Sequence, residues 1–488
     1  MVAYPEAVEL VVGFDLDMTL ADTGAGIVAT LHAVLGEHGL AVPTDVLAQH
    51  VGLVLEDIFG RYLPAAQVDA AADRYRELYP TSGIPGSTLL PGAAEAVAAV
   101  RALGGRVVVV TGKREQVARA VLEHVRLDVD VVSGSVFGSA KGAALREHGA
   151  QVYVGDHAGD MVGAVAAGAH AVGVRTGPAD ESVLRAAGAD VVLPDLTGFP
   201  AWLGEHVLDL RLADLAERLR ATGSLAVAFS GGADSAFLLA AAVRALGPDR
   251  VVAATAVSGS LADGELADAA AFARRLGVRH LTPTTDEMAR EGYRANAGDR
   301  CFFCKAELLD VLTPLARSVG IEAVATGTNA DDVLAGFRPG IRAAAERGAL
   351  TPLRDSGFTK DQVRAASARW GLPTWDKPAA ACLSSRIAYG VQITTAGLAR
   401  VDRAEAAARD WFADAGIAVR DLRVRDLGQD RARVEVDQDA LTALDRLGSA
   451  QQLHAAVLDA GFQAAEVDPR GFRSGSMNEL LPTPELFR

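Results

Sequence analysis

Cysteine is scarce in this sequence, with three residues among 488. A small, odd number argues against a disulfide framework and favours metal binding or catalysis as the role of the thiols. Long hydrophobic runs are also missing, because the apolar stretches are short and interrupted by charge or glycine, so no membrane span is expected. Residues 1–10 lack the basic start and long apolar core of a signal peptide. We therefore expect a cytoplasmic protein with no membrane partner.

Basic residues are outnumbered, with 47 Lys and Arg against 62 Asp and Glu, and the net charge is −15. This balance argues against a nucleic-acid partner, since phosphate backbones are bound by clustered Lys and Arg. Small molecules are the expected partners, and we also expect a homo-oligomer. A chain of this length is too long for one ordinary core, so two or three domains are predicted.

The first 203 residues alternate strand-like and helical segments. The apolar runs are Leu10–Phe14, Val107–Val110, Val131–Val132, Val152–Val154 and Ala171–Val174. This alternation is typical of an α/β domain built on a doubly wound parallel sheet. The pattern breaks between Pro194 and Glu205, where we place a domain boundary, and a helix is predicted over Leu208–Ala221.

A second alternating region, residues 208–389, predicts a second α/β sheet. Its strand-like runs are Leu225–Phe229, Val251–Val257 and Ala323–Thr326. Beyond Gly390 the pattern changes to a long helix near Thr395–Ala415, followed by strands near Asp421–Asp426, Arg431–Val436 and Phe462–Val467. Residues 390–488 are therefore expected to form a small α+β domain.

Two acidic residues follow the first predicted strand, in the sequence Asp15-Leu16-Asp17-Met18-Thr19. Carboxylates two residues apart at a strand end can take different catalytic roles. One attacks a phosphoryl group and binds a metal, and the other donates and then removes a proton. Further polar residues occur at later strand ends or at a helix start, namely Thr111, Lys141, Asp156 and Asp160.

Together these motifs resemble the haloacid dehalogenase superfamily, in particular its phosphoglycolate phosphatase-like branch, over about residues 1–203. The resemblance implies a Rossmann-like fold with a helical cap at about residues 22–85. It also implies these roles: Asp15 as nucleophile, Asp17 as general acid/base, Thr111 and Lys141 as phosphate ligands, and Asp15, Asp17, Asp156 and Asp160 as the Mg²⁺ site. Met18 replaces the commoner glycine but carries no chemistry. The substrate stays open, because cap residues choose it.

A phosphate-binding turn is predicted at Ser230-Gly231-Gly232-Ala233-Asp234-Ser235, between an apolar run and an Ala/Leu-rich helix. Two glycines let the backbone approach an oxyanion, the helix dipole favours negative charge, and Ser230 and Ser235 add hydroxyl donors. The turn lacks the ending of a Walker loop but has the SGGxDS form of the PP-loop enzymes, which hold the pyrophosphate of ATP while making an adenylate.

The three cysteines are Cys301 and Cys304, in a Cys-Phe-Phe-Cys pair, and Cys382. Structural zinc would require a fourth ligand, and no histidine lies near either segment. Three thiolates suit a 4Fe–4S cluster with one open iron, to which sulfide could bind. The alternative is that these are ordinary buried thiols.

From about Leu208 to its end, the chain resembles the LarE family of ATP-dependent sulfur transferases in nickel-pincer nucleotide synthesis. The resemblance rests on ordered motifs: Ser230–Ser235, Arg300–Lys305, Gly327–Asp332, Trp375–Pro378, Ala381–Arg386 and Gly471–Glu479. It implies a mononucleotide substrate whose two pyridinium carboxylates are adenylated by ATP and become thiocarboxylates.

The same resemblance implies roles for individual residues. Asp234 and Asp331 would be acids near the Mg²⁺ that bridges the ATP phosphates. Arg423 and Arg425 would bind the nucleotide's phosphate, with Glu405 nearby. Lys305 and Arg386 flank cysteines and would steady an anion there, or they are ordinary surface charges.

The sulfur source divides the family. In one type the cysteine matching Cys382 gives up its own sulfur. In the other, cysteines matching Cys301, Cys304 and Cys382 hold a 4Fe–4S cluster that carries added sulfide, and we favour this type because all three are present. Two other functions are considered: a tRNA-thiolating PP-loop enzyme, disfavoured by the acidic balance, and a redox or iron sensor, disfavoured by the intact motifs. For the fused phosphatase-like domain, our hypothesis is removal of pyrophosphate or of a stray phosphorylated intermediate.

Overall fold

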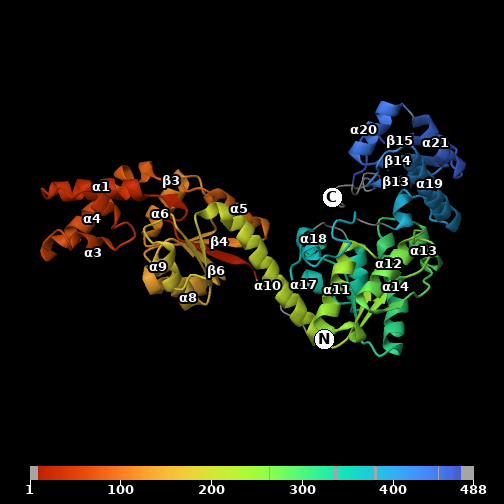
Figure 1. Cartoon of the computed structure of the whole chain (residues 1–488), viewed down its shortest axis with the longest axis horizontal. Helices are drawn as coiled ribbons and strands as arrows, with labels where there is room; N and C mark the ends of the chain where they lie inside the picture. The colour runs from red at the N-terminus through yellow and green to blue at the C-terminus, as the bar shows by residue number, and fades with distance from the viewer. Residues whose placement is uncertain are drawn as a thin grey trace. The chain divides into compact units, whose positions relative to one another are not determined.

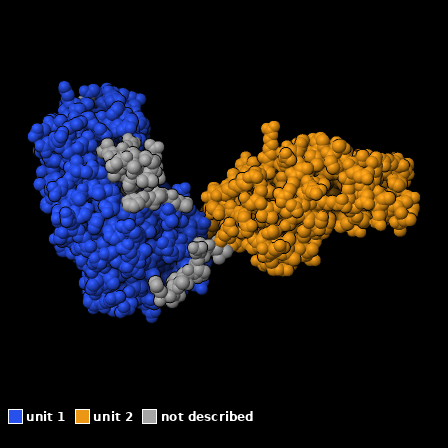
Figure 2. Space-filling view, turned by 180° about the vertical axis from the view of Figure 1, so that it is seen from behind, with its two compact units in different colours: residues 1–7, 208–488 blue, residues 8–207 orange. Residues whose placement is uncertain are grey.

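The computed structural model describes residues 9–262, 264–334, 338–378, 382–448, 450–473 and 477. The chain divides into two compact units, one of residues 8–207 and the other formed mainly by residues 208–488 (Figure 2). The boundary falls within helix α10 (Phe199–Ala221), which begins well before the predicted Leu208. Pro200 does not prevent this, because a proline in the first turn of a helix removes no helical hydrogen bond. Among the described helices, none combines the length and apolar character needed to cross a membrane.

The first unit is built on a parallel sheet with strand order β5-β4-β1-β6-β7-β8. Its strands are β1 (Val11–Phe14), β4 (Arg106–Val110), β5 (Val131–Ser133), β6 (Val152–Gly155), β7 (His170–Val174) and β8 (Val191–Leu193). Alternate residues enter different buried clusters, Val12 and Val107 in one and Val11 and Val108 in another. Both faces of the sheet are therefore covered, which confirms the predicted doubly wound α/β fold. The half-buried edge strand β8 was not predicted.

Helices follow the strands of this sheet as the alternation predicted (Figure 1). They are α5 (Ala93–Ala102), α6 (Glu115–His124), α7 (Lys141–His148), α8 (Ala158–Ala167) and α9 (Glu181–Ala186). A cap of further helices is inserted after β1: α1 (Gly24–Glu37), α2 (Thr44–Ala48), α3 (Leu55–Phe59) and α4 (Ala65–Ser82). The cap is entered and left through an antiparallel ribbon of β2 (Ala21–Asp22) and β3 (Thr88–Leu89).

The second unit contains a four-stranded parallel sheet with order β11-β10-β9-β12. Its strands are β9 (Leu225–Ala228), β10 (Val251–Ala254), β11 (Arg279–Leu281) and β12 (Ala323–Thr326). Strand β10 ends earlier than predicted, and the partly exposed β11 was not predicted. Val227 and Ala226 enter separate buried clusters, so this sheet is also covered on both faces. Helix α11 (Ala233–Leu246) follows β9 directly.

The same unit ends in a three-stranded sheet of β13 (Leu422–Asp426), β14 (Arg431–Val436) and β15 (Ala464–Val467). Helices α19 (Thr395–Asp414), α20 (Gln438–Leu447) and α21 (Ala450–Asp459) accompany it, as expected for a small α+β region. Its buried cluster also contains Tyr293, Leu383 and Ile387. The segment after Cys382 is thus packed into the core of this region.

Candidate active sites

The acids of the first unit meet at the carboxyl end of its sheet. Asp15 follows β1, and Asp156 follows β6, which pairs with β1. Asp15, Asp156 and Asp160 each offer a carboxylate oxygen within 4.8 Å of the others. Since a hard divalent cation prefers several carboxylate oxygens, this donor set fits Mg²⁺.

Lys141 is the cation at the centre of these acids. Its Nζ donates to Asp15 Oδ1 at 2.8 Å and to Asp160 Oδ1 at 2.5 Å. Burial raises the pKa of Asp15 to about 7, with the charge of Lys141 opposing that shift. Burial and then the charge of Asp160 raise the pKa of Asp156, whose Oδ1 accepts from Thr19 Oγ1 at 3.0 Å. A divalent cation bound among these carboxylates would favour their charged forms and oppose the rise in pKa.

Asp17 is held by a residue that the sequence analysis missed. Lys113 Nζ lies 2.8 Å from Asp17 Oδ1 and 4.5 Å from the ring centroid of Tyr79, a residue of the cap. Thr23 also donates to Asp17. Lys113 stands two residues after Thr111 at the end of β4, so its position at a strand end was the available signal.

A cavity of about 420 Å³ lies between these acids and the cap, and Gly112, Lys113 and Lys141 line it. Thr111, the predicted phosphate ligand, is buried and is not among the lining residues. Its Oγ1 accepts from the Lys113 N–H at 3.2 Å. Met18 has a φ of +57°, a left-handed conformation that explains why glycine is commoner at this position.

The phosphate turn of the second unit lies between β9 and α11. Gly231 has a φ of +75°, which a residue with a side chain rarely adopts. Ser235 Oγ accepts from the Ser230 N–H at 3.3 Å, and the two hydroxyl oxygens are 3.1 Å apart. A Cβ on Gly327 would lie 2.8 Å from Ser235 N, so the loop after β12 approaches this turn closely. The turn therefore has the strand-to-helix geometry of an anion site.

One cavity joins the phosphate turn to two cysteines. Its volume is about 630 Å³, and Ser230, Gly232, Asp234 and Ser235 line it together with Cys304 and Cys382. Cys301 is not among its lining residues. A group activated at the turn and a sulfur at Cys382 would thus lie in the same cavity.

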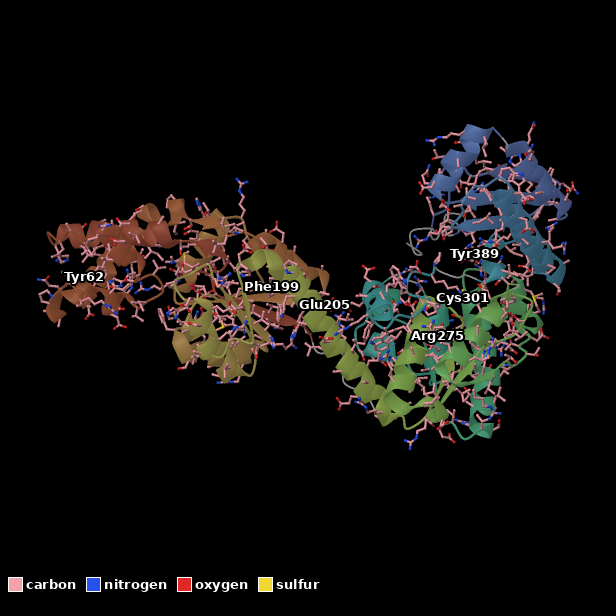
Figure 3. All side chains as sticks on the ribbon, viewed as in Figure 1. Tyr62, Phe199, Glu205, Arg275, Cys301 and Tyr389 are labelled. Carbon is pink, nitrogen blue, oxygen red and sulfur yellow. The ribbon has the colours of Figure 1, made fainter. Side chains whose placement is uncertain are left out.

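The cysteines come from two elements. Cys301 and Cys304 lie in the first turn and a half of α14 (Arg300–Ser318), and Cys382 precedes a 3₁₀ turn at Leu383–Arg386. Cys301, labelled in Figure 3 with Tyr389, is exposed, as is Cys382, while Cys304 is half-buried. Burial and then the charge of Cys382 raise the pKa of the Cys304 thiol. Within the described residues the three thiols do not lie within 4.8 Å of one another, the spacing of a single-ion site.

The loop that carries Cys382 is fixed by polar contacts. Cys382 Sγ lies 2.9 Å from Ser384 Oγ, and the Leu383 N–H donates to Ser260 O at 3.0 Å. Ser260 Oγ in turn donates to the buried carboxylate of Glu287 at 2.5 Å. Glu287 lines the cavity and was not predicted, because no sequence motif surrounds it.

Asp331, which was expected near the Mg²⁺ of ATP, does not line the cavity. Its carboxylate accepts from the Lys360 N–H at 2.7 Å, at the start of α18 (Lys360–Arg369), and Asp332 lines the cavity in its place. Both residues lie in the short helix α15 (Ala330–Leu334), so neighbouring side chains point about 100° apart. Burial and then the charge of Asp332 raise the pKa of Asp234.

Three cations to which the sequence analysis assigned no role line the same cavity. They are Lys360, Arg364 and Lys377. Lys377 Nζ donates to Gly231 O at 3.1 Å, and its own carbonyl accepts from Arg364 at 3.1 Å. Lys377 belongs to the motif Trp375–Pro378, to which no chemical role was assigned, whereas Lys360 and Arg364 lie outside the recognised motifs.

The predicted arginines form a buried cluster in the C-terminal region. Arg386 Nε donates to Glu405 Oε1 at 2.8 Å, and Arg425 donates to Glu435 Oε2 at 2.8 Å. Burial and then the charge of Arg386 lower the pKa of Arg423, whose guanidinium lies 5.4 Å from the ring centroid of Phe472. Arg386 is thus no surface charge, and Lys305 lines the cavity with its pKa lowered by burial.

Parts of two motifs lie outside the described residues. They are Ala381 of the segment Ala381–Arg386, and residues 474–476 and 478–479 of the final motif Gly471–Glu479. Within the described part of that final motif, the Phe472 N–H donates to Val436 O at 2.7 Å. The start of the motif is therefore attached to β14.

Comparison with known proteins agrees with the division of the chain into two units. Residues 12–174 match the haloacid dehalogenase-like hydrolase family, and residues 208–454 match the asparagine synthase family. A phosphoglycolate phosphatase of Caulobacter vibrioides is 30% identical over 210 residues, covering 39% of this chain and 88% of that protein.

Two relatives match the second unit over nearly their whole length. An uncharacterized protein of Synechocystis is 40% identical over 275 residues, covering 56% of this chain and 99% of that protein. The pyridinium-3,5-bisthiocarboxylic acid mononucleotide synthase of Lactiplantibacillus plantarum is 33% identical over 283 residues, covering 57% of this chain and 98% of that protein. The chain therefore belongs to the asparagine synthase-type PP-loop family, within it to the LarE family of that synthase, and joins this part to a haloacid dehalogenase-like hydrolase domain.

Proposed function

We propose that the second unit is an ATP-dependent sulfur transferase acting on a pyridinium dicarboxylate mononucleotide. The observation that carries the proposal is the single cavity shared by the phosphate turn, Cys304 and Cys382. The name of the Lactiplantibacillus relative supports the substrate class. The arginine cluster supplies a place for the nucleotide's phosphate, since guanidinium groups bind phosphate oxygens in pairs.

The reaction needs activation before sulfur can enter. A substrate carboxylate attacks the α-phosphorus of ATP, and pyrophosphate leaves into the turn at Ser230–Ser235, where backbone N–H groups and Lys377 stabilise its charge. A nucleophilic sulfur presented beside Cys382 then attacks the acyl carbon, and AMP departs with the electrons of the acyl C–O bond. Asp234 and Asp332 would hold Mg²⁺ with the ATP phosphates, because both carboxylates line the cavity.

The presence of three cysteines supports a 4Fe–4S cluster with added sulfide as the sulfur source. Three thiolates match the donor set of a 4Fe–4S cluster, and such a cluster, when bound, supplies an open iron for added sulfide. Cys301 and Cys304 of α14 and Cys382 before the 3₁₀ turn would hold such a cluster through their sulfur atoms. Arg386 donates to Cys382 O at 3.0 Å, a local contact that stabilises the turn carrying Cys382.

The test is an anaerobic assay of the full chain with ATP, Mg²⁺, sulfide and the dicarboxylate mononucleotide. We expect about four irons and four sulfides per chain, one AMP per thiocarboxylate, and repeated turnover. A single turnover with conversion of Cys382 to dehydroalanine would show the sacrificial route instead. AMP formation with tRNA but not with the mononucleotide would overturn the proposed substrate.

We further propose that the first unit is a Mg²⁺-dependent phosphohydrolase. Asp15 attacks phosphorus, the bond to the leaving oxygen breaks, and Asp17 donates the proton that this oxygen takes. Water, deprotonated by Asp17, then releases phosphate from Asp15. Lys141 and Lys113 balance the charge of the phosphoryl oxygens, and Mg²⁺, held by Asp15, Asp156 and Asp160, would add Lewis-acid stabilisation.

Release of phosphate from phosphomonoesters tests this second activity. We expect Mg²⁺-dependent release that the Asp15→Asn variant loses by at least about 10³-fold, because the nucleophile is removed. Sulfur transfer in the same variant should be unchanged. Phosphate release that survives the Asp15→Asn change would refute the assignment.

A further inference from the structure

The cavity of the first unit has a charged floor and an apolar roof. Asp15, Asp17, Lys113 and Lys141 form the floor at the ends of β1 and β4 and at the start of α7. The cap lines the opposite side mainly with aliphatic side chains: Ile27, Val51, Leu53, Val54, Leu55 and Ile58. A leaving group that enters this space is therefore surrounded chiefly by apolar surface, which favours an apolar ligand.

The basic side chains that the cap contributes to the cavity already have partners within the protein. Arg76 pairs with Glu56 and, at 2.9 Å, with Asp73. His50 is bound to the hydroxyl of Tyr62 at 2.7 Å, and its pKa is lowered by burial, so it is neutral near pH 7. Figure 3 labels Tyr62 in the cap.

The core side offers one more cation. Arg114 lines the cavity at the start of α6 but is exposed, so water screens its charge. Among the described lining residues, none places a buried cation free of a carboxylate partner against the roof. A carboxylate that a small substrate carries in addition to its phosphate, as phosphoglycolate does, would thus lose its hydration without a buried partner.

Aromatic rings line the cavity beside Asp17, the proposed proton donor to the leaving group. Asp17 gives its proton to the leaving oxygen, and its partner Lys113 lies under the ring of Tyr79. The rings of Tyr79 and Tyr75 are stacked, with centroids 5.5 Å apart and an angle of 24°. Across from the cap, Phe137 lines the cavity with 41% of its surface exposed. Its ring rests on Gly112, where a Cβ would lie 2.4 Å from Phe137 Cε1.

We propose, on the basis of the phosphohydrolase activity above, that this unit hydrolyses phosphomonoesters whose alcohol part carries an uncharged aromatic ring, with nucleoside 5′-monophosphates as the fitting class. The cavity of about 420 Å³ is within the size range of sites for such ligands. The ester P–O bond breaks, water supplies the hydroxyl of phosphate, and the alcohol leaves as the free nucleoside. Pyrophosphate, our earlier hypothesis, has no apolar part to match the roof.

The proposal also links the two units through a product. Adenylation followed by sulfur attack releases AMP, which is a phosphomonoester with an uncharged aromatic base. Hydrolysis of AMP would remove a product of the second unit and make sulfur transfer harder to reverse. The class of reaction that supplies this substrate is therefore an ATP-dependent adenylation.

The test compares five substrates with the full chain and Mg²⁺: AMP, phenyl phosphate, glycerol phosphate, phosphoglycolate and pyrophosphate. We expect kcat/KM for AMP and phenyl phosphate to exceed that for each of the other three by about tenfold or more. A value for phosphoglycolate, pyrophosphate or glycerol phosphate equal to or above that for AMP would overturn the substrate class alone. Phosphate release from none of the five would overturn both the substrate class and the phosphohydrolase activity.

A variant isolates the ring contact. Phe137→Ala should lower the ratio of kcat/KM for phenyl phosphate to that for glycerol phosphate by about three- to tenfold. Phe137→Trp, which keeps an aromatic ring at this position, should keep the ratio close to that of the unchanged chain. Val183→Ala, at an exposed position of α9, is the matched control. Because Phe137 is substantially exposed, its replacement should leave the fold intact. An unchanged ratio in Phe137→Ala would contradict the proposal.

Discussion

At the scale of single residues, the position of each cysteine matters more than the number of cysteines. Cys304 and Cys382 line the cavity of the phosphate turn, whereas Cys301 stands one helical turn away on α14 and is not part of that lining. If the enzyme gives up the sulfur of one of its own cysteines, only Cys382 is required. A cluster needs Cys301 as well, although Cys301 does not line the cavity.

Replacement of Cys301 therefore distinguishes the two routes. Cys301→Ser should abolish sulfur transfer as completely as Cys382→Ser does, because a cluster loses a ligand in either case. Pyrophosphate release from ATP in the presence of the mononucleotide should stay within about threefold of the unchanged chain in both variants, since the phosphate turn is untouched. A single full turnover by Cys301→Ser would rule out the cluster route.

Lys113 permits a second prediction at this scale. Its ammonium group pairs with Asp17 and lies beside the phosphoryl site. Lys113→Met should lower kcat for phosphomonoesters by roughly 10²-fold, because Asp17 loses the partner that orients it and a charge that balances the phosphoryl oxygens. Steady-state kinetics would measure this, with Arg119→Met on the exposed side of α6 as control. Equal rates in Lys113→Met and the control would show that Lys113 is dispensable.

At the scale of elements, the phase of a short helix decides which of two neighbouring acids lines the cavity of the phosphate turn. Helix α15 holds Asp331 and Asp332 next to each other, but only Asp332 lines the cavity. Asp331 instead satisfies a backbone N–H at the start of α18, which carries Lys360 and Arg364 to the same cavity. The two acids therefore have different tasks.

Paired alanine variants test this difference. Asp331→Ala should reduce the free energy of unfolding by about 1 kcal/mol, as the loss of a helix cap does, with little change in KM for Mg-ATP. Asp332→Ala should raise that KM by about tenfold or more with a smaller loss of stability. Denaturant unfolding and initial-rate kinetics would measure the two effects, and the reverse pattern would restore Asp331 as the acid near Mg²⁺.

At the scale of the whole molecule, each unit has hydrophobic clusters of its own. One unit is built around the six-stranded sheet and its cap, and the other around the four-stranded sheet with the C-terminal region. Because separate cores can unfold separately, we expect two thermal transitions in calorimetry of the full chain.

A ligand should move only one of these transitions. ATP with Mg²⁺ at about 100 times its Kd should stabilise the second unit by about 2.7 kcal/mol, which corresponds to a rise of roughly 5–10 °C in its Tm. The transition of the first unit should move by less than about 1 °C. One transition that shifts as a whole would mean that the two units unfold together.

The fold class and the chemical motifs could be predicted from the sequence, because both depend on short-range patterns. Apolar alternation located nearly all strands of both sheets, and the SGGxDS turn, with Gly231 at positive φ, needs only its own residues to form. The edge strands β8 and β11 were missed because half-buried strands have a weak apolar pattern.

Which residues meet in each site depends on three-dimensional packing and could not be predicted from the sequence. Lys113 reached Asp17, Lys377 reached Gly231, and Asp332 rather than Asp331 entered the cavity, through contacts between segments far apart in the chain or through helix phase. The apolar roof over Asp15 likewise arises from cap residues that no motif marks. Local propensity is encoded in neighbouring residues, whereas the lining of a cavity is set by packing of distant elements, and packing determines what each site can bind.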